Sequence, residues 1–174
     1  MGVFCRCHDV KFNKPIKKPP RSSLSLIIEN QKIIPAHLNI EYGDPSKTRY
    51  TLDSILKRNV ISHELIHFIE SNNSKLLKKS IDFVIKRNGN KQPRLLKDIY
   101  PNLRYRADER SYEDEYIEKG GSAYSGKEYK HNGKWFATDV LSMGIQRLIE
   151  NPLKFYETDK EYFEFTIKQL RGLL

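Results

Sequence analysis

The sequence feature that most constrains the fold is an apolar repeat that runs through residues 52–69. Its members are Leu52, Ile55, Leu56, Val60, Ile61, Leu65, Phe68 and Ile69. Their spacing predicts an amphipathic helix of about twenty residues. Thr51 or Asp53 is suited to cap its start, and Asn72-Asn73 is suited to end it.

This predicted helix carries a pattern of polar residues, His63-Glu64-Leu65-Ile66-His67. Residues four apart on an α-helix lie about 40° apart around the axis and roughly 6 Å along it. Two imidazoles in that relation can converge on one zinc ion. Glu64 is turned about 100° from His63, which suits it to accept a proton from a zinc-bound water rather than to ligate the metal. The alternative is a pair of core-facing histidines that are hydrogen-bonded by their neighbours.

The rest of the chain predicts short strands followed by helices. Residues 23–28 and 32–42 are rich in aliphatic and β-branched side chains, and Pro35 should make the second strand an edge strand or bend it. A helix over residues 74–87, with Leu76, Leu77, Ile81, Val84 and Ile85 facing inward, should end at Asn88-Gly89. Residues 91–118 are expected to be largely irregular. His131-Asn132-Gly133-Lys134 predicts a hairpin turn, and helices are expected over about 137–150 and 159–170.

The chain length favours one domain over residues 23–174, preceded by a Pro- and Lys-rich arm over residues 1–22. The 174 residues, 38% of them hydrophobic, suffice for a core without disulfides or a structural metal. A bound metal is therefore expected to serve chemistry rather than folding.

Cys5 and Cys7 lie too close together in the sequence for a disulfide between them to stabilise a fold. Together with His8, they also lack the paired spacing of the ligands in a structural zinc site. We expect ordinary reduced thiols. No apolar run approaches the roughly 18 residues of a membrane span, and the first residues lack the apolar core of a secretory signal. These features predict a reducing compartment, or export without a signal peptide.

The charge is concentrated in part of the chain. The formal net charge is +9, and residues 75–106 hold ten Lys or Arg against Asp82 and Asp98, a local charge of +8. Six acids then cluster in residues 107–119. The basic segment is interpreted as a solvated lysine-rich surface or as a surface that binds an acidic protein or nucleic acid.

On the His-Glu-x-x-His motif, the sequence resembles the zincin metallopeptidases. The resemblance implies a minimal zincin-like α+β fold, with a small N-terminal sheet and its substrate-aligning edge strand before the motif helix, and a helical C-terminal half with one β-hairpin. It also implies a hydrolase with one Zn²⁺ held by His63 and His67, with Glu64 shuttling protons. His67-Phe68-Ile69-Glu70 departs from the continuation of the metzincin subgroup.

A third zinc ligand is needed. Glu70 shares the helix, but its Cα is about 10 Å along the axis from His63. Asp139, which follows Thr138 at the start of a predicted helix, is easier to reach, as in the gluzincins. From about Lys127 to Gly172 the chain also resembles small zincin domains of phage head-morphogenesis proteins, where an acid, usually Glu, stands at the Asp139 position. Asp139 as a helix-dipole partner and the acids in residues 108–118 remain alternatives.

Oxyanion or substrate contacts are expected from Tyr129, His131 or Tyr124, with Tyr112 a further candidate. Each is also explained by ordinary hairpin packing, and His37 is expected to be structural.

The prediction is a zinc-dependent metallopeptidase acting on a protein or peptide, without membrane association, cytoplasmic or associated with a phage or its host. A basic nucleic-acid-associated binding module is one alternative. A non-catalytic zincin-fold component of a phage particle is another.

Overall fold

A computed structural model describes residues 10–13, 23–29, 32–41, 60–103, 105–112 and 119–172. The chain divides into two compact units, Met1–Asn72 and Asn73–Leu174, and each is described by itself. Both helices and short sheets are present, so the structure belongs to the α+β class, as predicted. None of the helices in the described ranges has the length and apolarity needed to cross a lipid bilayer.

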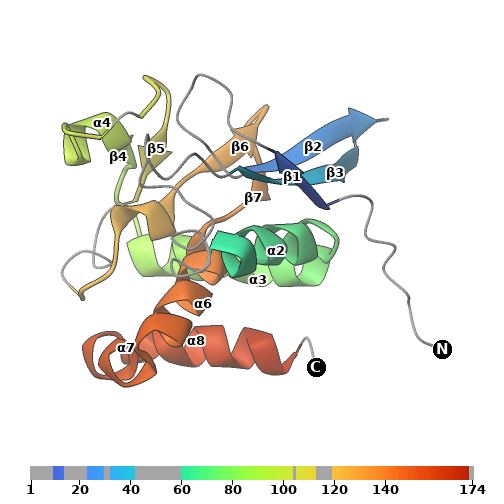
Figure 1. Ribbon diagram of the computed structural model, residues 1–174. Helices are drawn as coiled ribbons and strands as arrows, with labels where there is room; N and C mark the ends of the chain where they lie inside the picture. The colour runs from blue at the N-terminus through green and yellow to red at the C-terminus, as the bar shows by residue number, and fades with distance from the viewer. Residues whose placement is uncertain are drawn as a thin grey trace, which may run out of the picture. The chain divides into compact units, whose positions relative to one another are not determined.

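The first unit contains a three-stranded sheet (Figure 1). Its strands are β1 (Val10–Asn13), β2 (Ser23–Glu29) and β3 (Lys32–Glu41), in the order β1-β3-β2. β1 runs parallel to β3, and β2 runs antiparallel to it. The two predicted strands are confirmed, but the prediction that the second is an edge strand is wrong, because β1 pairs with its other side. β1 comes from the predicted arm, and the arm's other residues lie outside those described, with Cys5, Cys7 and His8.

The pairing of β3 explains how a middle strand accommodates Pro35. β1 pairs only with the last part of β3, from Leu38 to Glu41. Pro35 lies before that part, opposite Leu26 of β2, and the β2–β3 register shifts there between Ser25 and Leu26. A proline has no N–H to donate to a ladder. The missing hydrogen bond destabilises the sheet little at Pro35, because there only one side of β3 is paired among the described strands.

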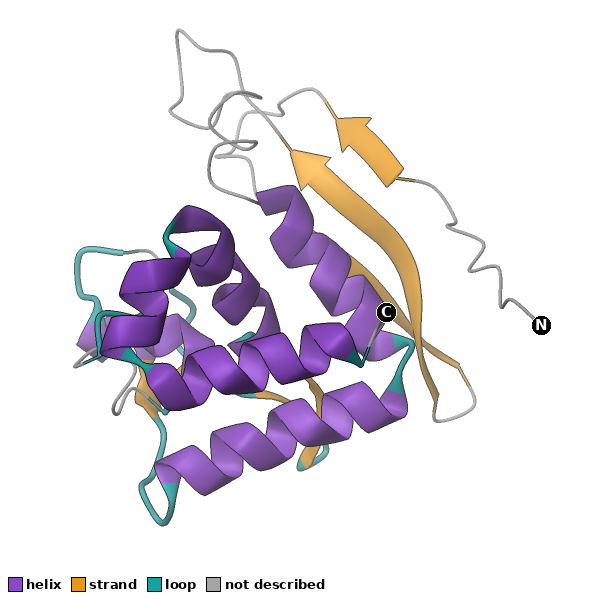
Figure 2. Ribbon diagram, turned by 90° about the horizontal axis from the view of Figure 1, so that it is seen from below, coloured by secondary structure: helices purple, strands orange, loops and turns teal. Residues whose placement is uncertain are grey.

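α2 (Val60–Ser71) follows the sheet and packs against β2 and β3 (Figures 1 and 2). It matches the second half of the predicted twenty-residue helix. The first half, with its expected caps Thr51 and Asp53, lies outside the described residues. The predicted end is confirmed, because Ser71 Oγ and Asn72 Nδ2 donate to the Phe68 carbonyl at 2.9 and 2.8 Å. These bonds satisfy a carbonyl that has no helical partner at the C-terminus of α2.

The second unit is built mainly of helices. α3 (Ser74–Asn88) starts where Asn73 Oδ1 accepts from the Leu76 N–H at 3.1 Å, and it stops at Gly89, whose φ of 56° suits glycine. α6 (Val140–Glu150) and α8 (Lys160–Arg171) match the two predicted C-terminal helices. α7 (Pro152–Thr158) was not predicted, although Asn151 and Pro152 form a standard N-cap and first position.

α6 contacts α3, α7 and α8, and the core of this unit lies among these helices. Its buried members are Phe83, Val84, Val140, Phe155 and Tyr162. On α3, Leu76 and Val84 are buried as predicted, whereas Ile85 is 50% exposed. The buried face is rotated toward Phe83 and Arg87 instead.

Short elements connect α3 to α6. β4 (Arg94–Leu95) pairs with β5 (Arg110–Ser111), and α4 (Leu96–Ile99) and the 3₁₀ turn η1 (Ala123–Gly126) complete a largely irregular stretch, as expected.

The predicted hairpin is confirmed as β6 (Tyr129–His131) and β7 (Lys134–Ala137). Its turn residues Asn132 and Gly133 have φ values of 50° and 75°, as a type I′ turn requires. The register places Tyr129 opposite Ala137. Tyr129 thereby lies beside the start of α6.

Candidate metal centre

The two histidines of the motif converge on each other. His63 Nε2 and His67 Nε2 are 3.0 Å apart, and their rings are 4.7 Å apart with an interplanar angle of 79°. The convergence follows from their i, i+4 spacing on α2. Two nitrogens bound to one tetrahedral zinc ion at its usual bond lengths would be about 3.3 Å apart. The observed pair is therefore close to the spacing of two ligands of one metal ion.

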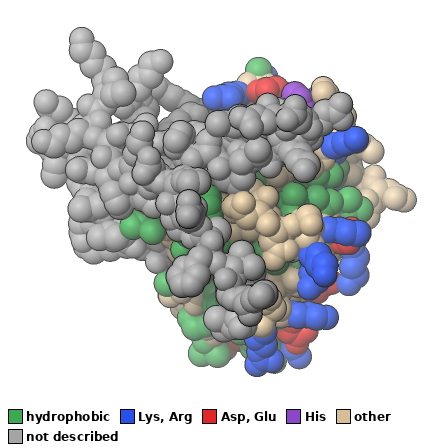
Figure 3. Space-filling model, turned by 90° about the vertical axis from the view of Figure 1, so that its right-hand side faces the viewer, with side chains coloured by type: hydrophobic (Ala, Val, Ile, Leu, Met, Phe, Trp, Pro, Cys, Tyr) green, Lys and Arg blue, Asp and Glu red, His purple; other side chains and the backbone are tan. Residues whose placement is uncertain are grey.

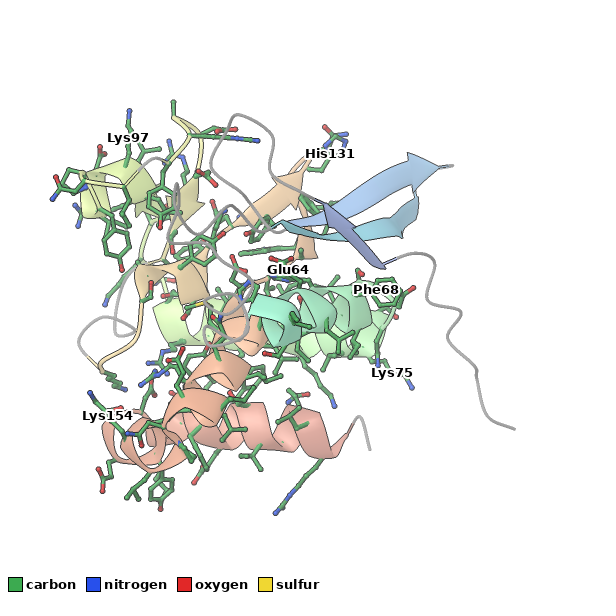
Figure 4. The ribbon with its side chains drawn as sticks, viewed as in Figure 1. Glu64, Phe68, Lys75, Lys97, His131 and Lys154 are labelled. Carbon is green, nitrogen blue, oxygen red and sulfur yellow. The ribbon has the colours of Figure 1, made fainter. Side chains whose placement is uncertain are left out.

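Glu64 lies between them in the sequence, and its side chain is 7% exposed. Figure 4 labels it near the start of α2. Glu70 is also buried, with 1% of its surface exposed, one helical turn beyond His67. α2 thus carries both the predicted ligands and two buried carboxyl groups.

Asp139 occupies the N-cap position of α6 and is fully buried. Tyr129 donates its phenolic proton to Asp139 Oδ2 at 2.7 Å. The interpretation of Asp139 as a helix-dipole partner on a solvated first turn does not fit this burial. Ser142 Oγ and the Met143 N–H donate to the Asp139 backbone carbonyl, which opens the helix.

Two neighbours of Asp139 belong to the predicted set of tyrosines. Tyr124 Oη lies 3.4 Å from Tyr129 Oη, and Lys127 Nζ donates to Tyr124 Oη at 3.2 Å. Burial, followed by the charge of Asp139, raises the pKa of both tyrosines. Both phenols therefore keep their protons at neutral pH and act as donors.

No role for Lys127 was predicted from the sequence, although its position between Tyr124 and Tyr129 could have indicated a contact with their rings. It is 7% exposed, and its Nζ lies 4.6 and 4.7 Å from the ring centroids of Tyr124 and Tyr129. Its ammonium group also donates to Glu109 Oε1 at 2.7 Å. Cation–π contacts and an ion pair thus hold Lys127 next to Tyr124 and Tyr129, the two tyrosines that lead to Asp139.

The other candidates lie elsewhere in the described structure. His131 is exposed at the end of β6 (Figure 4), and Tyr112 donates to Glu128 at 3.2 Å. Asp108 is exposed, and Glu109 is engaged by Lys127. Residues 113–118 lie outside the described residues, as does the side chain of His37 on β3.

The three ligands predicted from the sequence fall in different units of the chain. His63 and His67 lie together on α2, and Asp139 lies at the N-terminus of α6. Each of them offers a nitrogen or oxygen atom of the kind that zinc binds. That one metal ion is held by all three is a proposal.

The basic segment over residues 75–106 is partly neutralised. Lys75 and Lys97 are exposed and labelled in Figure 4, and Lys or Arg side chains alternate with acids on the described part of the face in Figure 3. Ion pairs among the described residues of the segment include those of Lys78 with Asp82, Lys86 with Glu161 and Arg87 with Asp159. Binding of nucleic acid or of an acidic protein by this segment remains a prediction.

Comparison with models of protein families, with curated proteins and with solved structures finds no match to this chain.

Proposed function

We propose that the chain is a zinc-dependent metallopeptidase of the zincin type, with one Zn²⁺ held by His63, His67 and Asp139 and with Glu64 as the general base. The observation that carries the proposal is the pair of imidazoles whose Nε2 atoms converge to 3.0 Å on α2, together with a buried glutamate next to the first histidine. Asp139, whose carboxylate is buried, is proposed as the third ligand, as predicted from the sequence. The order of the first unit, a small sheet followed by the motif helix, also supports it.

The donor set favours a catalytic zinc ion. Three protein ligands of nitrogen and oxygen, with a further position left for water, are typical of catalytic zinc sites, whereas structural sites are closed by four ligands. Two histidines and a carboxylate also suit iron(II) in oxygenases. Glu64, adjacent to a ligand on the same helix, favours hydrolysis because this reaction needs a base beside the metal.

The chain's own residues would carry the proton transfers. A bound zinc ion would supply a Lewis acid for the scissile carbonyl and lower the pKa of a water molecule. Glu64 would accept a proton from that water and deliver it to the nitrogen of the leaving amine. His63, His67 and Asp139 would keep the metal ion in a fixed position while Glu64 gains and loses its proton.

The test is a comparison of metal content and peptide cleavage in the full chain. Protein purified without chelators should contain zinc and cleave members of a diverse peptide library, read by mass spectrometry. Glu64→Gln should keep the zinc and lose about 10²- to 10⁴-fold in cleavage rate, because it lacks the base. Glu70→Gln, a change of a second buried glutamate on α2, is the matched control and should retain cleavage.

The proposal is wrong if the native protein contains no zinc, or if Glu64→Gln cleaves as fast as the unchanged protein. Zinc binding without any cleavage would favour the non-catalytic zincin-fold alternative. Zinc-independent binding of DNA or RNA that weakens steeply with salt would favour the nucleic-acid-binding alternative.

A further inference from the structure

Asp139 and Asp159 occupy the same position in two helices of the second unit but use their carboxylates differently. Both are N-cap residues with 0% and 1% of their surface exposed. Asp159 Oδ1 accepts from the Tyr162 N–H at 3.3 Å and so caps α8. The Asp139 side chain makes no such bond to the described backbone of α6. Its Oδ2 accepts instead from Tyr129.

Two other described helices have a polar N-cap residue that bonds as Asp159 does. Asn73 caps α3 through the Leu76 N–H, and Asn151 caps α7 through the Lys154 N–H. A short polar side chain at the N-cap ordinarily takes this bond because the first N–H groups of a helix have no helical partner. The carboxylate of Asp139 is therefore turned away from its usual role and toward the hairpin.

The hydrogen bonds that lead to Asp139 have one consistent direction. A phenol has a single proton to donate, and Tyr129 donates its proton to Asp139. Tyr124 must then donate to Tyr129, and Tyr124 in turn accepts from Lys127. The chain runs from a buried ammonium group through two phenols to a carboxylate. A donor chain that starts at a cation polarises each bond that follows it.

The fold holds both Tyr129 and Lys127 in place within this series of hydrogen bonds. Tyr129 lies on β6, whose pairing with Ala137 ties it to the strand that leads into Asp139. Lys127 follows η1 directly, and its N–H donates to the Tyr124 carbonyl at 3.1 Å. Glu109 Oε1 accepts from the ammonium group of Lys127. Such anchored partners can set the plane of a carboxylate.

We infer that Tyr129 is a positioning residue that orients the Asp139 carboxylate for metal binding, and that Tyr124 and Lys127 hold Tyr129 in place. The inference rests on the proposed metal site. Hydrogen-bonded partners of metal ligands fix ligand orientation and tune metal affinity. The inference also changes the role expected for Tyr129, because its only proton is committed to Asp139 and does not serve an oxyanion.

The experiment measures the Zn²⁺ affinity of the full chain by competition with a chromogenic chelator at one pH. Tyr129→Phe removes only the hydroxyl, and it should weaken zinc binding about 10- to 100-fold. Tyr124→Phe removes the donor to Tyr129 and should weaken binding less than Tyr129→Phe does. Tyr112→Phe is the matched control, since it removes a half-buried phenol that donates to Glu128, and its zinc affinity should be unchanged.

A second measurement separates positioning from general stability. The visible absorption of the Co²⁺-loaded protein reports the geometry of the ligands. This spectrum should shift in Tyr129→Phe and not in Tyr112→Phe. Tyr124 is one hydrogen bond further from Asp139 than Tyr129 is. The Tyr124→Phe variant therefore still tests the inference if Tyr129→Phe does not fold.

Unchanged zinc affinity and an unchanged cobalt spectrum in Tyr129→Phe, or in Tyr124→Phe if that variant alone folds, overturn the inference and leave the proposed function standing. Failure of the unchanged protein to bind zinc overturns both. An equal loss of affinity in Tyr129→Phe and Tyr112→Phe also overturns the inference, because it indicates a general loss of stability.

Discussion

Arg87 and Asp159, which are 72 positions apart, are joined by two parallel hydrogen bonds of 2.9 and 2.6 Å. Their side chains are 1% and 0% exposed. Arg147 lies 3.6 Å from the same carboxylate. The two guanidinium carbons lie 5.6 and 5.8 Å from the ring centroid of Tyr162. One carboxylate therefore balances two buried or half-buried cations where α3, α6 and α8 meet.

Asp159→Asn should destabilise the second unit strongly. An asparagine retains an oxygen to cap α8 but removes the buried negative charge that Arg87 and Arg147 share. Removing one partner of a buried ion pair costs about 3–5 kcal/mol, and urea unfolding would measure the loss. Lys86→Gln, which breaks the exposed pair with Glu161, is the control and should cost less than about 1 kcal/mol. Equal costs for the two variants would contradict this account.

Gly144→Ala should also destabilise the protein. A Cβ at this position of α6 would lie 2.4 Å from Thr166 Oγ1 and 3.0 Å from a ring carbon of Tyr162 on α8. Forcing the two helices apart should cost about 1–3 kcal/mol, measured from the urea midpoint. In a Thr166→Ala background the same change should cost less, because the closest obstacle is gone. An undiminished cost there would show that the contact with Thr166 is not the cause.

The Glu109–Lys127 pair should make stability depend on pH. Burial alone would raise the Glu109 pKa, but bonds from Lys127 and the Arg106 N–H, with the charges of both residues, hold it below its ordinary 4.5. A carboxyl group with a lowered folded-state pKa stabilises the fold above its unfolded pKa and loses this contribution as pH falls through the folded value.

Glu109→Gln should therefore lower the urea midpoint at pH 7, and the difference from the unchanged protein should shrink as pH falls below about 4.5. Asp108→Asn, a change of the exposed neighbouring acid, is the control and should have little effect at pH 7. A Glu109→Gln difference that stays constant with pH would show that the carboxylate charge is not responsible.

Metal binding should distinguish the candidate third ligands. His63→Ala and Asp139→Ala should lose bound zinc, whereas Glu70→Gln should retain it. Because a ligand that binds only the folded state stabilises it, free zinc at 100 times its Kd should add about 2.7 kcal/mol to the unfolding free energy. This increment should disappear in Asp139→Ala. Full zinc content in Asp139→Ala would assign the third ligand to another residue.

Much of the fold could be predicted from short stretches of sequence. The ends of α3 follow from Asn73 and Gly89, and the hairpin follows from Asn132-Gly133, because each signal acts on backbone groups a few residues away. α7 carries equally local signals and was overlooked. The rotated face of α3 was not predictable in this way, since the buried Arg87 pairs with Asp159, which lies 72 positions further along the sequence.

At the site itself, the sequence alone determined that His63 and His67 share one face of a helix with Glu64 beside them, because helical geometry repeats within a single turn. It also proposed Asp139 as a ligand. Only the tertiary structure decided that β3 is a middle strand, that Asp139 is buried, and that Lys127, Tyr124 and Tyr129 form a donor chain to it. These features join residues across strands and turns, and such pairings depend on which surfaces the folded chain buries together.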